Sequence, residues 1–262
     1  MSLLKAKQIT VRFGGVQALN RLELNVGEGE IYGLIGPNGS GKTTFINVVA
    51  GFFRPTSGSI FFLGDDITGL KPDQVTSRGI SRTFQNIRLF KTMTVLENVA
   101  VGYHPRGKSG LIDSIIRSDL FHSEEKATWE RAEELLEFFG LWGRRNDWAG
   151  GLPYGQQRLL ELARAMASNP KILLIDEPAA GMNEQETKQL IELFLKINEQ
   201  GYTMLIIEHD MKLIMNISQR ISVLDFGEKI AEGTPEEIQR NSRVIEAYLG
   251  YGAGQKASSL SH

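Results

Sequence analysis

The sequence predicts an α/β fold in which a parallel β-sheet is covered by helices and a mainly helical sub-domain is inserted into it. Three short, almost wholly apolar runs, at residues 172–175, 204–207 and 221–224, indicate strands that are buried on both faces. Such strands are typical of a parallel sheet with helices on both sides. The stretch from about residue 90 to residue 168 holds no comparable run, which favours a helical insertion.

The first quarter of the chain adds further strands. Residues 22–26 alternate between apolar and polar side chains, and this period-two pattern predicts a half-buried strand. A second apolar run, at residues 31–36, leads into a glycine-rich loop. Residues 53–64 predict a turn followed by a strand, because proline, serine and glycine punctuate the start of the segment.

The inserted part contains one long predicted helix. Ser123 is expected to begin it, because the two glutamates that follow would lie near the positive end of the helix dipole. Apolar side chains then recur at helical spacing until Gly140, which is expected to end the run. These side chains are Trp129, Ala132, Leu135, Leu136 and Phe139. We interpret the stripe as core packing.

Composition excludes several classes of protein. The 262 residues include 29 basic and 31 acidic ones, a net charge of −2 that gives no case for bulk attraction to nucleic acid or to an acidic membrane. The absence of cysteine excludes disulfides and thiolate catalysis. No run reaches the roughly 18 apolar residues of a membrane span, and no targeting segment is visible. We expect a soluble, cytoplasmic chain with a flexible tail at residues 251–262.

Residues 36–44 read GPNGSGKTT and lie between a predicted strand and a predicted helix. This is the full G-x-x-x-x-G-K-[ST] pattern in the context that it requires. Glycines let successive backbone N–H groups point into one concavity, where a helix N-terminus adds its dipole. The lysine can reach the β- and γ-phosphates, and the threonine that follows can ligate Mg²⁺. The predicted nucleotide-binding residues here are Gly36, Pro37, Asn38, Gly39, Ser40, Gly41, Lys42, Thr43 and Thr44.

Four polar residues outside this loop predict the rest of a hydrolytic site. Asp176 ends a buried strand, at the sheet edge where ligands bind, and can hold Mg²⁺ through water. Glu177 follows it and can act as the general base toward the attacking water. Gln85 offers a neutral amide to a metal-bound water. His209, after a predicted strand, can bond a γ-phosphate or hold the attacking water in line.

Five segments together resemble the nucleotide-binding subunits of ATP-binding-cassette (ABC) transporters. In chain order they are GPNGSGKTT, FQ (84–85), LPYGQQ (152–157), LLIDEP (173–178) and IIEHD (206–210). The resemblance implies a P-loop NTPase (RecA-like) core with an N-terminal antiparallel β sub-domain. It implies one ABC ATPase domain over residues 1–250, with its core at about 1–85 and 169–250 and its helical sub-domain at about 86–168.

The resemblance also assigns roles to residues. It implies that Gln85 is a metal ligand, that Glu177 is the catalytic base, and that His209 is the switch histidine. Phe13 lies where the family places an aromatic ring that stacks on adenine. Two such domains sandwich two ATP molecules head to tail, so that Gly155 and Gln156 bind the nucleotide of another subunit.

Longer phrases resemble the importer ATPases for branched-chain amino acids. They are FGGVQAL (13–19), GISRTFQNIRLFKTMTVLENV (79–99), DEPAAGMN (176–183), AEGTPEEI (231–238) and VIEAYLG (244–250). This implies two membrane permease subunits, an indirectly linked substrate-binding protein, and a homodimer or a heterodimer with a related ATPase subunit. The chain would then lie on the inner face of the cell membrane, and the segment 86–98 would dock a permease helix. Lipopolysaccharide-export ATPases share the compact layout, but the insertion around residues 104–122 favours the importer.

Two departures from the family pattern affect the second ATP site. The usual signature Leu-Ser-Gly-Gly-Gln is replaced by LPYGQ, so Pro153 lacks the serine hydroxyl and Tyr154 has no assigned role. The acidic residue usual in the loop after the catalytic glutamate is Asn183 here, which weakens the expected charge interaction across the dimer.

Three alternatives belong to other functional classes. A soluble ABC ATPase of DNA repair would carry long coiled coils between the nucleotide half-sites, but no sustained heptad follows Lys42. A translation factor of this family usually has two cassettes, whereas this chain has a single phosphate loop. A subunit that binds ATP without turnover would hydrolyse none even when assembled. We therefore expect ATP and Mg²⁺ as ligands and no nucleic-acid partner.

Overall fold

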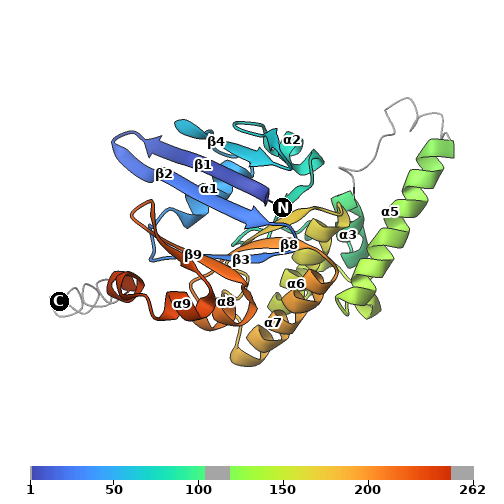
Figure 1. Ribbon diagram of the computed structural model, residues 1–262. Coiled ribbons are helices and arrows are strands. Elements are labelled where there is room, and N and C mark those ends of the chain that lie inside the picture. The colour runs from blue at the N-terminus through green and yellow to red at the C-terminus, as the bar shows by residue number, and fades with distance from the viewer. Residues whose placement is uncertain (1, 104–118, 249–262) are drawn as a thin grey trace. The chain divides into compact units, whose positions relative to one another are not determined.

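A computed structural model describes residues 2–103 and 119–248, which form two compact units (Figure 1). The first unit holds the chain up to Val75 and again from Leu174, and the second is Thr76–Leu173. The predicted tail at residues 251–262, and most of the insertion around residues 104–122, lie outside the described residues.

The first unit begins with an antiparallel sheet whose strand order is β2-β1-β4-β5. Its strands are β1 (Ser2–Phe13), β2 (Val16–Gly27), β4 (Ser57–Phe62) and β5 (Asp65–Asp66). Gly14, with φ of 57°, makes the turn between β1 and β2. The implied N-terminal antiparallel region is thus confirmed, and the half-buried strand expected at residues 22–26 is part of the longer β2, in which buried and exposed residues alternate over that range.

A second sheet of the first unit carries the strands in the order β10-β9-β3-β8-β7. They are β3 (Ile31–Ile35), β7 (Ile172–Asp176), β8 (Thr203–Ile207), β9 (Arg220–Asp225) and β10 (Glu228–Gly233). Strand β3 runs parallel to β8 and β9, while β10 is antiparallel to β9. Every residue of β3, β7 and β8 is buried, so the prediction of strands apolar on both faces is confirmed.

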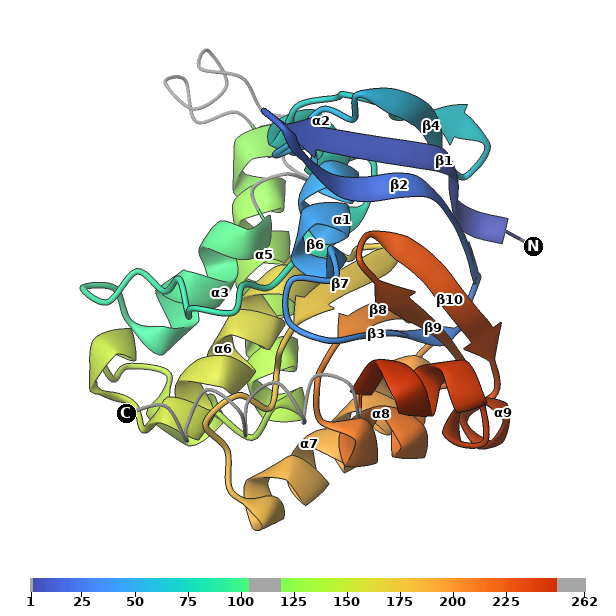
Figure 2. The same cartoon turned by 90° about the vertical axis from the view of Figure 1, so that its left-hand side faces the viewer.

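Helices cover this sheet on both faces. Figure 2 shows α1 between the two sheets and α8 and α9 on the other side of β3 and β9. Gly33 explains how closely α8 packs, because a Cβ there would lie 2.9 Å from Cγ2 of Ile214. The helices of this unit are α1 (Lys42–Val49), α7 (Glu184–Glu199), α8 (Met211–Ile217) and α9 (Pro235–Gln239), and residues 242–248 are also helical.

The second unit is mainly helical, as predicted. Helix α3 packs against both α5 and α6. A three-residue strand, β6 (Ile80–Arg82), lies beside the start of β7, where the Lys171 N–H donates to the Gly79 carbonyl at 2.7 Å. Its helices are α3 (Val95–Tyr103), α5 (Asp119–Phe138), η2 (Trp142–Arg144), η3 (Ala149–Gly151) and α6 (Tyr154–Ala167), and α2 (Pro72–Ser77) spans the unit boundary in the chain.

Two expectations about the long helix are wrong. Ser123 lies inside α5 and does not begin it, because the polar residues around it continue the helix as an exposed face. Trp129 is partly exposed, since the apolar stripe thins toward the start of α5. The rest of the stripe, at Ala132, Leu135, Leu136 and Phe139, is buried as core.

Candidate active site

The predicted phosphate loop joins β3 to α1, and its glycines are fixed by their neighbours. Gly36 has φ of 151° and Gly41 has φ of 102°, a region that disfavours residues with a side chain. A Cβ at Gly36 would lie 2.1 Å from the Leu224 carbonyl, and one at Gly41 would lie 2.6 Å from that of Ala18. The loop therefore packs closely against the backbone of Ala18 and Leu224.

Lys42 begins α1 and its side chain is buried in this loop. Its Nζ donates to the carbonyls of Gly36 and Pro37 at 2.8 and 2.9 Å. Burial lowers the pKa of Lys42, although the carboxylates of Glu177 and Asp176 oppose that shift. A buried ammonium group that is held by carbonyls at the N-terminus of a helix is suited to bind a polyphosphate. Asn38, Gly39 and Thr43 are exposed at the same loop, while Ser40 is buried and Thr44 is half-buried.

The two predicted carboxylates lie at the end of β7. Asp176 is its buried last residue. Glu177 has φ of 47°, and its N–H donates to the Ile207 carbonyl at the end of β8, at 2.9 Å. A non-glycine residue in the left-handed region costs of order 1–3 kcal/mol and is concentrated at functional sites. The left-handed conformation of Glu177 thus lies where the chain leaves β7.

His209 lies next to Glu177 in space. Its Nδ1 is 3.8 Å from Oε1 of Glu177, and its side chain is 57% exposed. The same Nδ1 is 3.6 Å from Oε2 of Glu208, which is buried. The phosphate-loop lysine, both carboxylates and the histidine therefore belong to one unit, and the first three interact electrostatically.

Phe13 ends β1 and is 47% exposed, which argues against a place in the core. Its ring makes an edge contact with Phe53 at a centroid distance of 5.2 Å. The role of Phe13 in stacking on adenine remains a prediction.

The loop after Glu177 ends at Asn183, which has a structural role of its own. Its side chain accepts the N–H groups of Gln185 and Glu186 at 3.0 Å each, and the Glu186 carboxylate accepts the Asn183 N–H in return. This capping box starts α7. An amide oxygen serves here as well as a carboxylate, which gives a local reason for the departure from an acidic residue.

Gln85 and the LPYGQ segment belong to the second unit. Gln85 is exposed, and its carbonyl accepts a short hydrogen bond from Arg158. Pro153 occupies the N-cap of α6, so no hydroxyl caps this helix, and Gly155 and Gln156 lie in its first turn. The Tyr154 hydroxyl accepts from Arg158 Nη2 at 3.1 Å.

Sequence reasoning missed the pair that holds the Gln85 segment. Arg158 donates to the Phe84 carbonyl at 2.7 Å, and Glu161 accepts the N–H groups of Phe84 and Arg88 at 3.4 and 3.3 Å. Arg158 and Glu161 also pair with each other at 3.3 Å, and both are buried. Their signal in the sequence is an Arg and a Glu, three residues apart, on the apolar side of a helix.

Among the described residues, no group of three or more histidines and carboxylates is placed to hold a metal ion. Thr43 and Asp176 offer oxygen ligands, which suit Mg²⁺ when nucleotide phosphates supply further ones. No helix in the described ranges is long and apolar enough to cross a membrane.

Comparisons with known proteins agree with this geometry. The family described as "ABC transporter" matches residues 19–180, and that described as "Branched-chain amino acid ATP-binding cassette transporter" matches residues 228–254. The high-affinity branched-chain amino acid transport ATP-binding protein LivG of Salmonella typhimurium (strain LT2) is 47% identical over 249 residues, covering 95% of this chain and 98% of LivG.

Solved structures that are similar to this chain include two ATP-binding cassettes. The ADP conformation of MJ1267, an ATP-binding cassette of an ABC transporter, has a TM-score of 0.83 and 35% identity, covering 95% of this chain and 99% of MJ1267. The dimeric post-hydrolysis state of the ATP-binding cassette MJ0796, bound to ADP and Pi, has a TM-score of 0.74 and 29% identity. The match covers 89% of this chain and 99% of MJ0796.

Proposed function

The chain belongs to the ABC transporter family of ATPases, and from that premise we propose that it drives an importer of branched-chain amino acids. The observation that carries the substrate class is the 47% identity to LivG over nearly the whole chain. The C-terminal match at residues 228–254 supports the same choice over a lipopolysaccharide exporter.

The chemistry is hydrolysis of ATP, and the residues of the first unit supply its groups. The loop N–H groups and Lys42 bind and neutralise the β- and γ-phosphates. Thr43 and Asp176 would hold Mg²⁺, which screens phosphate charge when bound. Glu177 takes a proton from the attacking water, and His209 orients that water or the γ-phosphate. Gln85 as a further metal ligand remains a prediction.

A second ATPase subunit is needed to complete each site. The dimeric state of MJ0796 supports this arrangement for a related cassette. In this chain, the first turn of α6, with Gly155 and Gln156, would present N–H groups to the γ-phosphate held by the other subunit. Pro153 adds no hydroxyl there, so hydrolysis at the site that uses LPYGQ depends on backbone groups.

The second unit carries a groove suited to a membrane permease. A cavity of about 530 Å³ is lined by aromatic and basic side chains, among them Phe84, Arg88, Phe90 and Arg164. Arg88 lies 4.2 Å from the Phe84 ring centre and Arg164 lies 5.5 Å from that of Phe90. A guanidinium that stacks on an aromatic ring keeps its N–H groups available as donors to a carboxylate of a partner protein. We infer that the segment from Asn86 to Phe90 docks a permease helix, which places the chain peripherally at the membrane.

Substitution of the proposed base tests the ATPase mechanism. Glu177→Gln keeps the shape of the side chain but cannot accept the proton, so we expect steady-state hydrolysis to fall at least about a hundredfold, the lower end of the range for loss of a general base. ATP binding should persist and trap a dimer, measured by gel filtration with ATP. Wild-type turnover in this variant would show that another group is the base.

Reconstitution tests the transport role. The chain would be co-expressed with candidate permeases and its ATPase rate measured with binding protein loaded with leucine, isoleucine or valine. Stimulation by these amino acids is expected. Co-purification with ribosomes or DNA, and with no permease, would contradict the importer.

A further inference from the structure

Glu208 is a buried charged residue that the hydrolysis described above does not use. It follows the last residue of β8, Ile207, and only 1% of its surface is exposed. A carboxylate at such a place costs free energy unless hydrogen bonds satisfy both of its oxygens. Its partners therefore indicate why a charge is placed there.

Three backbone N–H groups donate to this carboxylate. Oε1 accepts from Ala179 at 2.9 Å. Oε2 accepts from His209 at 2.8 Å and from Asp210 at 3.2 Å. All three partners are hydrogen-bond donors. A carboxylate can accept all three bonds because both of its oxygens are acceptors. A neutral amide cannot, because its NH₂ group is itself a donor.

These bonds join the two segments that carry the proposed chemistry. Ala179 lies two residues after Glu177, and His209 is the residue next to Glu208. The strands already link these segments once, through the Glu177 N–H and the Ile207 carbonyl at 2.9 Å. Glu208 adds a second link beyond the strand ends, where no strand pairing remains.

We infer that Glu208 is a positioning residue for ATP hydrolysis, an inference that rests on the proposed function. It holds the backbone of His209 and the loop that begins at Ala179 in one arrangement, with the imidazole 3.8 Å from the Glu177 carboxylate. The loop that begins at Ala179 runs on to Asn183, the N-cap of α7. Glu208 is not part of the loop around Lys42 that is proposed to bind the phosphates.

Because Glu208 holds the segments of Glu177 and His209 and not the phosphate loop, its substitution should affect kcat more than the KM for ATP. The variant Glu208→Gln tests this expectation. The amide would direct an NH₂ group toward either the Ala179 N–H or the two N–H groups on the other side. We expect kcat to fall tenfold or more, about 1.4 kcal/mol in the barrier. The KM for ATP should change less than threefold, because the phosphate loop keeps its contacts.

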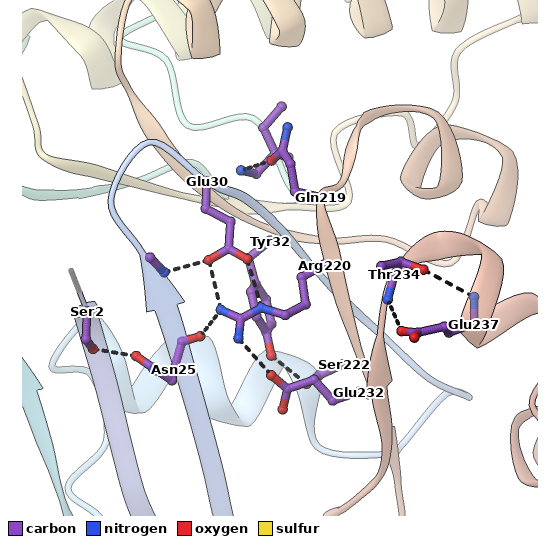
Figure 3. Close-up of polar contacts among 12 residues, drawn as sticks. Ser2, Asn25, Glu30, Tyr32, Gln219, Arg220, Ser222, Glu232, Thr234 and Glu237 are labelled. Atoms are coloured by element: carbon purple, nitrogen blue, oxygen red, sulfur yellow. Dashed lines mark hydrogen bonds and ion pairs between the residues drawn. The ribbon is translucent and has the colours of Figure 1, made fainter.

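Glu30 offers a matched control carboxylate at the opposite end of β3 from the phosphate loop. It also accepts a backbone N–H, that of Gly27 at 2.6 Å, and it pairs with Arg220 at 2.9 Å (Figure 3). Glu30→Gln should lower the melting temperature with kcat unchanged. A general loss of stability would affect both variants alike, whereas a positioning role affects kcat only in the Glu208 variant.

The variant Glu208→Asp provides a second test in case Glu208→Gln does not fold. The shorter carboxylate keeps its charge and its reach to the N–H groups of the next two residues, but withdraws from Ala179. We expect a folded protein with kcat reduced at least threefold and KM nearly unchanged.

All variants would be purified as the full chain, with ATPase rates measured on the complex with permeases and ATP binding and melting measured on the subunit. Wild-type kcat in a folded Glu208→Gln, or in Glu208→Asp if the first does not fold, would overturn the inference. An equal loss of kcat in Glu30→Gln would also overturn it. Absence of hydrolysis by the wild-type complex would instead contradict the proposed function.

Discussion

Replacing Arg158 by methionine removes the cation that anchors the Gln85 segment in the second unit. Methionine keeps much of the length and apolar volume of the side chain but has no donor. The substitution leaves four acceptors without this partner: the carbonyls of Phe84 and Gln85, the Tyr154 hydroxyl and the Glu161 carboxylate. Only 4% of Arg158 is exposed, so water cannot readily replace it.

The size of the effect follows from burial. Removing one partner of a buried ion pair costs about 3–5 kcal/mol, because the other charge stays in a poor solvent. Glu161 limits the loss by taking up a proton. Burial already raises the pKa of Glu161, and the backbone N–H of Arg88 and the charge of Arg158 oppose that shift. The variant lacks one of these opposing effects, so the pKa of Glu161 rises further.

This linkage fixes the direction of the pH dependence. When folding raises the pKa of a carboxyl group, protonation of that group stabilises the folded state. This stabilisation is complete below the ordinary pKa of 4.5 and is lost as the pH rises through the pKa of the folded state. The deficit of Arg158→Met against wild type should therefore be largest near about pH 8 and smaller near about pH 5, with a slope of at most about 1.4 kcal/mol per pH unit.

Urea unfolding followed by circular dichroism measures both the loss in the free energy of unfolding and its dependence on pH. The matched control is Arg144→Met, since Arg144 and Asp147 form a pair with the same three-residue spacing, 3.2 Å apart and about half exposed. Exposed pairs contribute roughly 0–1 kcal/mol. Equal losses in the two variants, or a deficit for Arg158→Met that does not shrink toward low pH, would refute the reasoning.

Two further substitutions test the phosphate loop and the groove. Gly41→Ala adds a Cβ 2.6 Å from the Ala18 carbonyl, so we expect ATP affinity to fall at least about tenfold in a binding titration. Gly201→Ala, also at positive φ but with open space around it, bears only the backbone cost of about 1–2 kcal/mol and should bind ATP normally. Arg88→Glu reverses a charge lining the groove, and co-purification with the permease should fall at least about tenfold. The same change at Lys126, exposed on α5, should leave co-purification intact, and equal losses would contradict the docking proposal.

Those parts of the fold that local pattern determines could be predicted. The apolar runs of β7, β8 and β9 identified buried strands, because burial on both faces excludes polar residues from nearly every position. Strand β6 was missed because three residues carry no period. Ser123 was misplaced as a helix start because a Ser-Glu-Glu run is equally compatible with an exposed helix face.

The anchors of the site could not be read from motifs for a different reason. Arg158 and Glu208 act on backbone groups of segments distant in sequence, and a backbone N–H or carbonyl leaves no trace in residue identity. A motif records which side chains meet the ligand, but not what fixes the loops that bear them. The signals of these anchors in the sequence are a charged residue on the apolar side of a helix, at Arg158, and a charged residue that directly follows an apolar run, at Glu208.

The LPYGQ segment illustrates what such anchors change. Its proline removes a hydroxyl from the N-cap of α6, which sequence comparison alone interprets as a loss. Its tyrosine, however, accepts a hydrogen bond from Arg158, and the same guanidinium holds the carbonyls of Phe84 and Gln85. One buried cation thus connects the turn proposed to face the partner's ATP with the segment proposed to meet the permease. Because these bonds share one donor group, a displacement of the Gln85 segment that moved Arg158 would also disturb its hydrogen bond to Tyr154, the first residue of α6.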